Sequence, residues 1–243
     1  MSMSNYWIAP RGPLELKTGD IHLWRVDLDR NPHHLPALEQ TLAPAERRRA
    51  AAFRFAADRT RYSLTRGALR TILARYLIIS PEKLVLRAGP QGKPELAGGE
   101  LRFNVSHSDG LALFAITSAH DVGIDVERVR GGIEEDISAW FLSLRAIRLL
   151  EALPKPARQR AFFQGWTRME AYSKASGDQI SAGLENFDSF LRLRRPVFDA
   201  WWLHDFFPRR GYVATVAARA RTCRFSYWRF AAGQAADSVG RRN

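Results

Sequence analysis

Three segments of the chain are predicted to form β-strands, and in two of them, at residues 101–105 and 122–126, apolar side chains alternate with other residues at the spacing of a strand. The first is IHLWRVDL at residues 21–28, and the third is VGIDV at residues 122–126. Between them, residues 101–116 are divided into two strands by the turn sequence SHSDG. Two later runs, WWLHDFF and GYVATVAAR, are joined by PRR and have the composition of a further strand pair. Strands are therefore expected in both halves of the chain.

Apolar residues spaced three and four apart predict helices in other segments. They cover residues 64–77, a stretch around residues 133–141, a stretch that begins at Ser143 as its cap, and residues 160–176, which end at Gly177. The tail AADSVGRRN is expected to be disordered.

The mixture of helices and strands in both halves predicts an α+β fold with two lobes. The simplest division places residues 1–118 in an N-terminal lobe and residues 119–243 in a C-terminal lobe, which meet near residues 117–121. A chain of 243 residues is long enough to bury a substantial core in this arrangement.

Composition and charge narrow the class of protein. No apolar run is long enough to cross a membrane, and the first 20 residues lack the features of a signal peptide, so a soluble, cytoplasmic protein is expected. The lone Cys223 excludes an intramolecular disulfide. A formal net charge of +12 favours an anionic partner: nucleic acid, a phosphorylated cofactor or an acidic protein.

Two carboxylates lie side by side in the third predicted strand. Val122, Ile124 and Val126 occupy one face, so Asp125 and Glu127 share the other. One interpretation is a half-buried strand whose polar face meets water. The other is a site for Mg²⁺, which usually takes one or two protein carboxylates and completes its coordination with water and phosphate.

The helix WTRMEAYSK contains a third candidate carboxylate. Trp166, Glu170 and Lys174 are spaced four apart and line one face. A surface Glu–Lys pair is the ordinary interpretation. If this face meets Asp125 and Glu127, Glu170 completes a magnesium site and Lys174 can contact a phosphate.

Ser106 and His107 are expected in the tight turn after the first strand of residues 101–116. Backbone N–H groups, a hydroxyl and an imidazole in such a turn can hold a pyrophosphate. A simple hydrogen-bonded turn is the alternative. No nucleophile elbow surrounds Ser106, which argues against a hydrolase.

The three motifs together identify a family. FNVSHSDG, then VGIDVE, then FFQGWTRMEAYSKASG resemble, in order and spacing, the 4′-phosphopantetheinyl transferases of the larger, surfactin-synthetase-activating type. The likeness extends weakly upstream through LAPAERRRAAAFRFAADRTR and GKPEL. The family usually carries lysine at Met169 and glycine at Gln179, so this chain departs from the pattern there.

The resemblance implies a fold of two similar α/β lobes, a pseudo-dimer, that binds coenzyme A in the cleft between them. It implies transfer of the phosphopantetheine arm to a serine of an acidic apo carrier protein of fatty acid, polyketide or nonribosomal peptide synthesis. The implied roles are Mg²⁺ binding by Asp125, Glu127 and Glu170, catalysis by Glu170, Glu127 and Lys174, and coenzyme A binding by Arg61, Lys93, Ser106, His107 and Lys174.

The implied enzyme acts as a monomer and does not bind nucleic acid or membrane. Glu170 comes first and Glu127 second as the base that accepts the serine proton. Two other functions stay open from the sequence: a paralogue that binds coenzyme A or carriers with little turnover, and a basic nucleic-acid-binding protein.

Overall fold

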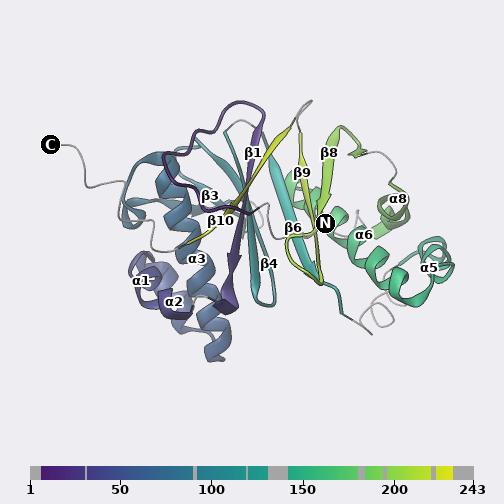
Figure 1. Ribbon diagram of the computed structural model, residues 1–243, viewed down its shortest axis with the longest axis horizontal. Helices are drawn as coiled ribbons and strands as arrows, with labels where there is room; N and C mark the ends of the chain where they lie inside the picture. The colour runs from purple at the N-terminus through teal and green to yellow at the C-terminus, as the bar shows by residue number, and fades with distance from the viewer. Residues whose placement is uncertain are drawn as a thin grey trace.

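The computed structural model describes residues 7–30, 32–89, 92–118, 120–130, 142–179, 184–193, 196–219 and 223–231. These residues form the expected α+β fold with two lobes, each of which packs a long helix against a four-stranded sheet (Figure 1). The two long helices, α3 (Ala56–Leu77) and α6 (Lys155–Ser176), lie on opposite outer sides of the molecule and have 22 residues each. Among the described residues, none of the helices combines the length and apolar composition that a membrane span needs.

The sheet of the first lobe has the strand order β10-β1-β5-β4. Its strands are β1 (Asp20–Asp27), β4 (Arg102–Ser108), β5 (Leu111–Thr117) and β10 (Arg224–Arg229). The remaining elements of this lobe are α1 (Leu35–Gln40), α2 (Pro44–Ala51), three short 3-10 turns (Leu28–Arg30, Pro32–His34, Pro81–Lys83) and the small ribbon of β2 (Leu86–Ala88) and β3 (Pro94–Leu96).

The sheet of the second lobe has the order β6-β9-β8-β7 and is antiparallel throughout. Its strands are β6 (Val122–Arg128), β7 (Val197–Phe198), β8 (Trp201–Phe206) and β9 (Tyr212–Ala218). Helices α5 (Leu144–Glu151) and α8 (Phe187–Arg192) lie beside α6 at the far end of this lobe (Figure 1).

Apolar side chains build the molecule as four layers. One cluster joins α3 to the first sheet and includes Leu69 of α3 and Phe114 of β5. A second cluster fills the space between the two sheets and includes Leu113 of β5 and Ile124 of β6. Further clusters join α6 to the second sheet, α5 and α8. The apolar contact between the sheets therefore makes one body of the two lobes.

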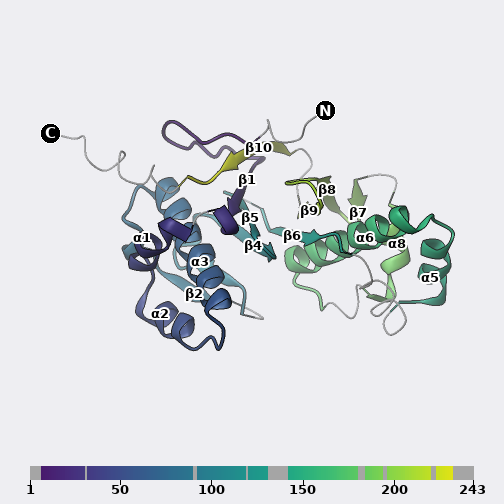
Figure 2. The same cartoon turned by 60° about the horizontal axis from the view of Figure 1, so that its bottom comes forward.

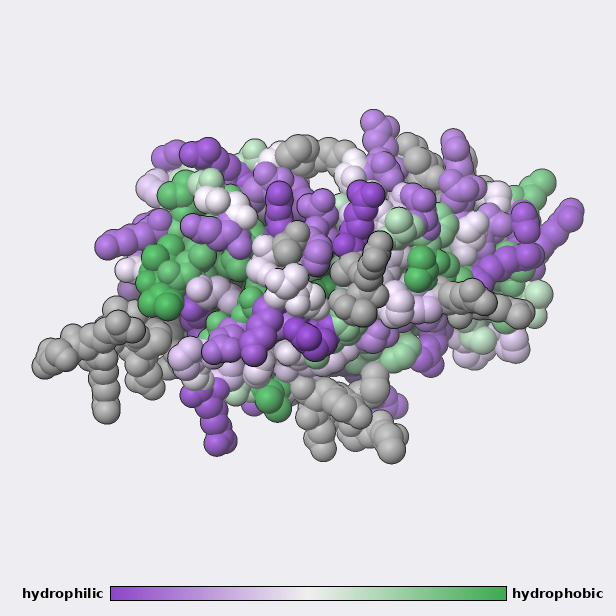
Figure 3. All heavy atoms as spheres, turned by 90° about the horizontal axis from the view of Figure 1, so that it is seen from above, coloured by the Kyte–Doolittle hydropathy of each residue, from purple (hydrophilic) through white to green (hydrophobic). Residues whose placement is uncertain are grey.

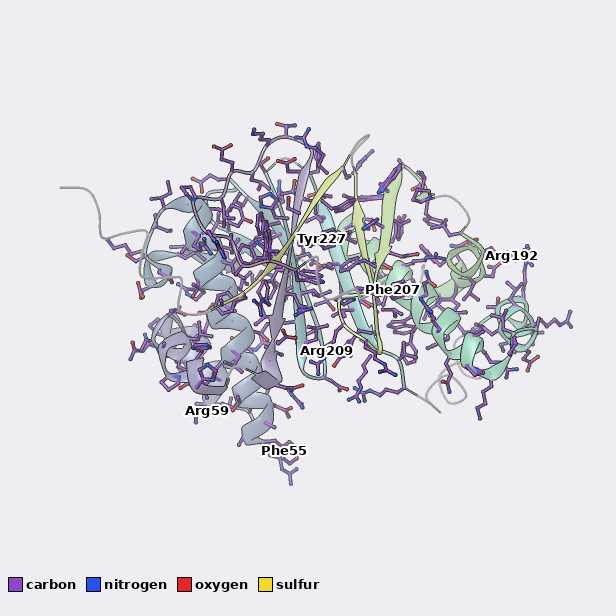
Figure 4. The ribbon with its side chains drawn as sticks, in the orientation of Figure 1. Phe55, Arg59, Arg192, Phe207, Arg209 and Tyr227 are labelled. Carbon is purple, nitrogen blue, oxygen red and sulfur yellow. The ribbon has the colours of Figure 1, made fainter. Side chains whose placement is uncertain are left out.

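Strand β10 connects the two lobes, although it belongs to the second half of the chain. It pairs in parallel with β1 in the first sheet (Figure 2). Tyr227 of β10 reaches the other way, and its hydroxyl is hydrogen-bonded to His204 Nε2 of β8 at 2.8 Å. Arg209, in the middle of the β8–β9 turn, adds an ion pair with Asp27 at 3.8 Å (Figure 4). The division into residues 1–118 and 119–243 stays a prediction, and the first sheet does not follow it strictly.

The predicted helices agree with the structure but begin earlier. Residues 64–77 lie in α3, which starts at Ala56, and residues 160–176 lie in α6, which starts at Lys155 because proline suits a first turn. Ser143 caps α5, since its Oγ accepts a hydrogen bond from Ala146 N–H at 3.2 Å. The helix expected at residues 133–141 and the tail expected to be disordered lie outside the described residues.

The turn predicted at SHSDG is shorter than expected. Ser106, His107 and Ser108 belong to β4 and pair with β5, so only Asp109 and Gly110 make the turn. The placement of Ser106 and His107 in a turn was wrong, because the strand pairing extends through both polar residues.

Gly123 allows α6 to lie directly on β6. A Cβ atom at Gly123 would stand 2.1 Å from the Ala171 carbonyl oxygen and 2.6 Å from the Ala175 nitrogen, both backbone atoms of α6. Real Cβ atoms do not approach that closely, so any other residue forces the helix away from the strand.

We expect Gly123→Ala to destabilise the protein by about 1–3 kcal/mol, because the helix backbone cannot yield without disturbing the packing around it. Urea unfolding measures the change. Gly12→Ala is the matched control, because nothing lies within 4 Å of its added Cβ. Equal stability of the two variants would contradict the close approach.

Met169 is completely buried in the cluster between α6, α5 and α8. We therefore expect Met169→Lys to lower the thermal unfolding temperature sharply, because an unpaired ammonium in an apolar core costs several kcal/mol. Met169→Leu, which keeps the volume, should cost less than about 1.5 kcal/mol. A stable, fully folded Met169→Lys protein would show that the lysine finds a route to water.

Candidate active site

The alternation of β6 places its carboxylates as the sequence predicts. Val122, Ile124 and Val126 point into the core between the sheets. Asp125 is buried, with 3% of its surface exposed, and Glu127 is half-buried at the end of the strand. The water-facing interpretation therefore fails for Asp125.

Helix α6 presents Glu170 and Lys174 to these carboxylates. Lys174 Nζ lies 2.6 Å from Asp125 Oδ1, to which it donates, and 3.7 Å from Glu170 Oε2. The structure thus brings Lys174 into contact with both Asp125 and Glu170, and Glu170 and Lys174 share a helix face as their spacing predicts. The pair is not an ordinary surface pair, because Lys174 bridges two elements of the lobe.

Burial and charge oppose each other in this cluster. Burial raises the pKa of Asp125, Glu127 and Glu170 above the usual values of carboxyl groups. Burial alone would lower the pKa of the Lys174 ammonium, but the neighbouring carboxylates, Asp125 foremost, raise it. With all four groups charged, the three carboxylates exceed the single ammonium by two negative charges.

Three side chains on β4 face the same cluster from the first lobe; we call Asn104, Ser106 and Ser108 the polar row. Asn104 Oδ1, Ser106 Oγ and Ser108 Oγ accept hydrogen bonds from the N–H groups of Ile124, Val126 and Arg128 at 2.8, 3.3 and 3.2 Å. Each partner lies 20 residues further along the chain, so β4 and β6 run side by side in one constant register.

The hydroxyls of the polar row also reach the carboxylates of β6. Ser106 Oγ donates to Asp125 Oδ1 at 2.8 Å, and Ser108 Oγ donates to Glu127 Oε2 at 2.8 Å. Burial raises the pKa of these carboxyl groups, whereas the hydrogen bonds from the two serines lower it and so favour the charged carboxylates.

Asp125 supplies the observation that bears on a metal ion. Its Oδ1 has two donors, whereas its Oδ2 is buried and has no hydrogen-bond partner. Within the described part of the chain, no three His, Cys, Asp or Glu side chains converge closely enough to hold a metal by themselves. The hard oxygen donors, the unpartnered Oδ2 and the excess negative charge nevertheless suit a divalent cation such as Mg²⁺.

A cavity of about 880 Å³ lies on the other face of β4. Successive strand residues point to opposite faces, so His107 lines this cavity while Ser106 faces Asp125. Arg61 of α3 lines the same cavity, as do Arg49 and Arg66. The pKa of His107 is lowered, first by burial and then by the nearby Lys174 ammonium. The cavity is rich in groups that bind phosphate.

Lys93 does not line that cavity. Its ammonium donates to the carbonyl oxygens of Lys174 at 3.0 Å and Val122 at 3.3 Å, beside a smaller cavity of about 230 Å³. Lys93 therefore ties the loop before β3 to the ends of α6 and β6. The structure brings Arg61 and His107 together and places Lys93 apart from them.

Several residues that shape the site were not predicted from the sequence. Asn104 and Ser108 belong to the polar row, and their signal was the period-two spacing of Asn-x-Ser-x-Ser in FNVSHSDG. Asp205 of β8 accepts from Gln164 Nε2 at 2.8 Å, from Thr215 Oγ1 at 2.8 Å and from Arg168 Nη2 at 2.6 Å. Asp205 thereby fixes α6 against the sheet. No local pattern in the sequence predicts this role.

Two family models match the chain. The 4′-phosphopantetheinyl transferase superfamily matches residues 121–217, which include β6 and α6, and the model of the 4′-phosphopantetheinyl transferase, N-terminal, matches residues 26–119. The matched segments contain both the carboxylate cluster and the polar row.

Curated relatives agree with these matches. The 4′-phosphopantetheinyl transferase HetI of Nostoc sp. is 35% identical over 237 residues, which are 94% of this chain and 100% of HetI. The 4′-phosphopantetheinyl transferase psf-1 of Bacillus pumilus is 32% identical over 59% of this chain and 62% of its own length. The transferase gsp of Aneurinibacillus migulanus is 31% identical over 52% of this chain and 56% of its own length. The chain therefore belongs to the 4′-phosphopantetheinyl transferase superfamily and is an enzyme of that class.

Proposed function

We propose that the protein transfers the 4′-phosphopantetheine arm of coenzyme A to a serine of an apo carrier protein in a Mg²⁺-dependent reaction. In this step the serine oxygen bonds to the β-phosphorus, and the bond from that phosphorus to the bridging oxygen breaks. Adenosine 3′,5′-bisphosphate leaves with the electron pair. The observation that carries the proposal is the carboxylate cluster with its unpartnered Asp125 Oδ2, next to a cavity whose lining includes Arg61 and His107.

Asp125, Glu127 and Glu170 are the proposed ligands of Mg²⁺, which when bound would neutralise charge on the pyrophosphate. Lys174 is the proposed phosphate contact of the same cluster, because its ammonium is charged and already lies among the carboxylates. A buried site with fixed charges stabilises a developing charge more strongly than water does.

Glu170 is the first candidate for the base that accepts the serine proton. Burial raises its pKa, which makes a carboxylate a better proton acceptor. Glu127 comes second, because its Oε2 already accepts a hydrogen bond from Ser108.

Arg61 and His107 are the leading proposed contacts of coenzyme A, because they share the large cavity. Ser106 and Lys93 stay proposed contacts with less support. The Ser106 hydroxyl is bonded to Asp125, and the Lys93 ammonium is bonded to two carbonyl oxygens.

An acidic carrier suits the charge of the protein, which is +12 overall. Seen from above, hydrophilic residues are spread over the whole visible face, with apolar areas between them (Figure 3). Membership of the family favours a transferase over a binding-only paralogue or a nucleic-acid-binding protein.

Mass spectrometry of carrier proteins tests the function directly. Incubated with coenzyme A, Mg²⁺ and the protein, an apo carrier should gain the mass of one phosphopantetheine arm, and a carrier whose acceptor serine is changed to alanine should not. No mass gain on acidic carriers of all three biosynthetic types would contradict the proposal.

We expect carrier modification to stop in excess EDTA and to return when Mg²⁺ exceeds the chelator, because the cluster has an uncompensated negative charge that would repel a pyrophosphate. Initial rates of holo-carrier formation measure this. EDTA saturated beforehand with Mg²⁺ is the control. Full activity in metal-free EDTA would remove the metal from the mechanism.

Glu170→Gln should lower kcat/KM by at least about a hundredfold, because the amide is neither a base nor a good ligand of Mg²⁺. Steady-state kinetics on one carrier provides the measurement. Glu151→Gln makes the same chemical change at an exposed position of α5 and should leave kcat/KM within about twofold. A small loss for Glu170→Gln would assign the base elsewhere.

A further inference from the structure

Ser108 of β4 contacts two neighbouring groups of β6. Its Oγ accepts a hydrogen bond from Arg128 N–H at 3.2 Å and donates one to Glu127 Oε2 at 2.8 Å. Ser108 is buried, with 7% of its surface exposed, and β4 pairs with β5 along its whole length. The hydroxyl is therefore held by a rigid strand of the first lobe, while the carboxylate belongs to the second.

The chemistry of a hydroxyl makes this contact directional. A serine has one proton to donate, and its lone pairs can accept. The N–H group of Arg128 can only donate, so it bonds to a lone pair of Ser108 Oγ. The hydroxyl proton of Ser108 therefore remains to be donated to Glu127. One oxygen of the Glu127 carboxylate is thereby tied to the first lobe, and the other is left for a cation.

We infer that Ser108 is a positioning residue of the metal site: it orients the Glu127 carboxylate, and through it the first lobe sets the affinity of the second lobe for the divalent cation. The inference rests on the proposed function, because it needs Glu127 to be a ligand. Hydrogen-bond partners of metal ligands commonly contribute ten- to a hundredfold to metal affinity by fixing the orientation of the ligand.

Asn104 separates this role from a merely structural one. It belongs to the same polar row, four residues before Ser108, and is equally buried. Its Oδ1 accepts a hydrogen bond from Ile124 N–H at 2.8 Å. Its side chain has no hydrogen bond to a carboxylate of the cluster. Loss of Asn104 should therefore loosen the contact between the strands without releasing a metal ligand.

The test is the affinity for Mn²⁺, used as a probe for Mg²⁺ and measured by electron paramagnetic resonance of the full chain with saturating coenzyme A. We expect the Kd for Mn²⁺ to rise by about ten- to a hundredfold in Ser108→Ala. Ser108→Thr keeps the hydroxyl and should restore the Kd to within about threefold of the unchanged protein. Asn104→Ala should also stay within about threefold, and thermal unfolding of all variants confirms that each is folded.

Two results would overturn the inference while the proposed function stands. One is a Kd unchanged in Ser108→Ala, and the other is an equal loss of Mn²⁺ affinity in Asn104→Ala. If the unchanged protein itself bound no Mn²⁺ at millimolar concentration, the metal assignment and this inference would both be wrong. Ser189→Ala, at an exposed position of α8, is the matched control for a lost hydroxyl.

Discussion

Three backbone N–H groups on the open edge of β6 face the other lobe, and the polar row of β4 gives each of them a partner. β6 pairs with β9 on one side only, so its other edge would lose these hydrogen bonds if apolar side chains covered it. Side chains here replace the backbone ladder that would otherwise continue the sheet. The register of the two lobes follows from these contacts, and the two serines of the polar row also donate to the β6 carboxylates.

Burial of several carboxylates close together is unfavourable, and neighbouring groups of the protein offset part of this cost. Burial disfavours charge on Asp125, whereas the Lys174 ammonium and the Ser106 hydroxyl favour it. Gly123 lets α6 approach closely enough for Lys174 to reach Asp125, and Asp205 holds the helix at that place. The fold thus concentrates negative charge at one point and leaves part of it without a paired cation among the four groups of the cluster.

The periodicity of the sequence predicted which residues share a face of a single strand or helix. The two-residue repeat of β6 gave the shared face of Asp125 and Glu127, and the four-residue spacing of α6 gave that of Glu170 and Lys174. The periodicity did not predict contacts between different strands and helices. Ser106 and His107 are adjacent in the sequence but face a carboxylate and a cavity, because β4 continues past the point where the turn was expected. The Lys93 ammonium donates hydrogen bonds to two carbonyl oxygens that are distant in the sequence and are brought close to it only by the tertiary structure. The pairing of β10 with β1 needed knowledge of both ends of the chain.

The position of β10 has a consequence for how the protein is made. A ribosome delivers β1, β5 and β4 early, but the strand that completes their sheet emerges about 200 residues after β1, as the register of Asp20 with Arg224 shows. Until then β1 has an open edge, which is a site for wrong strand pairing. The first sheet therefore lacks its fourth strand until residues 224–229 are available, and these follow every strand of the second lobe in the chain.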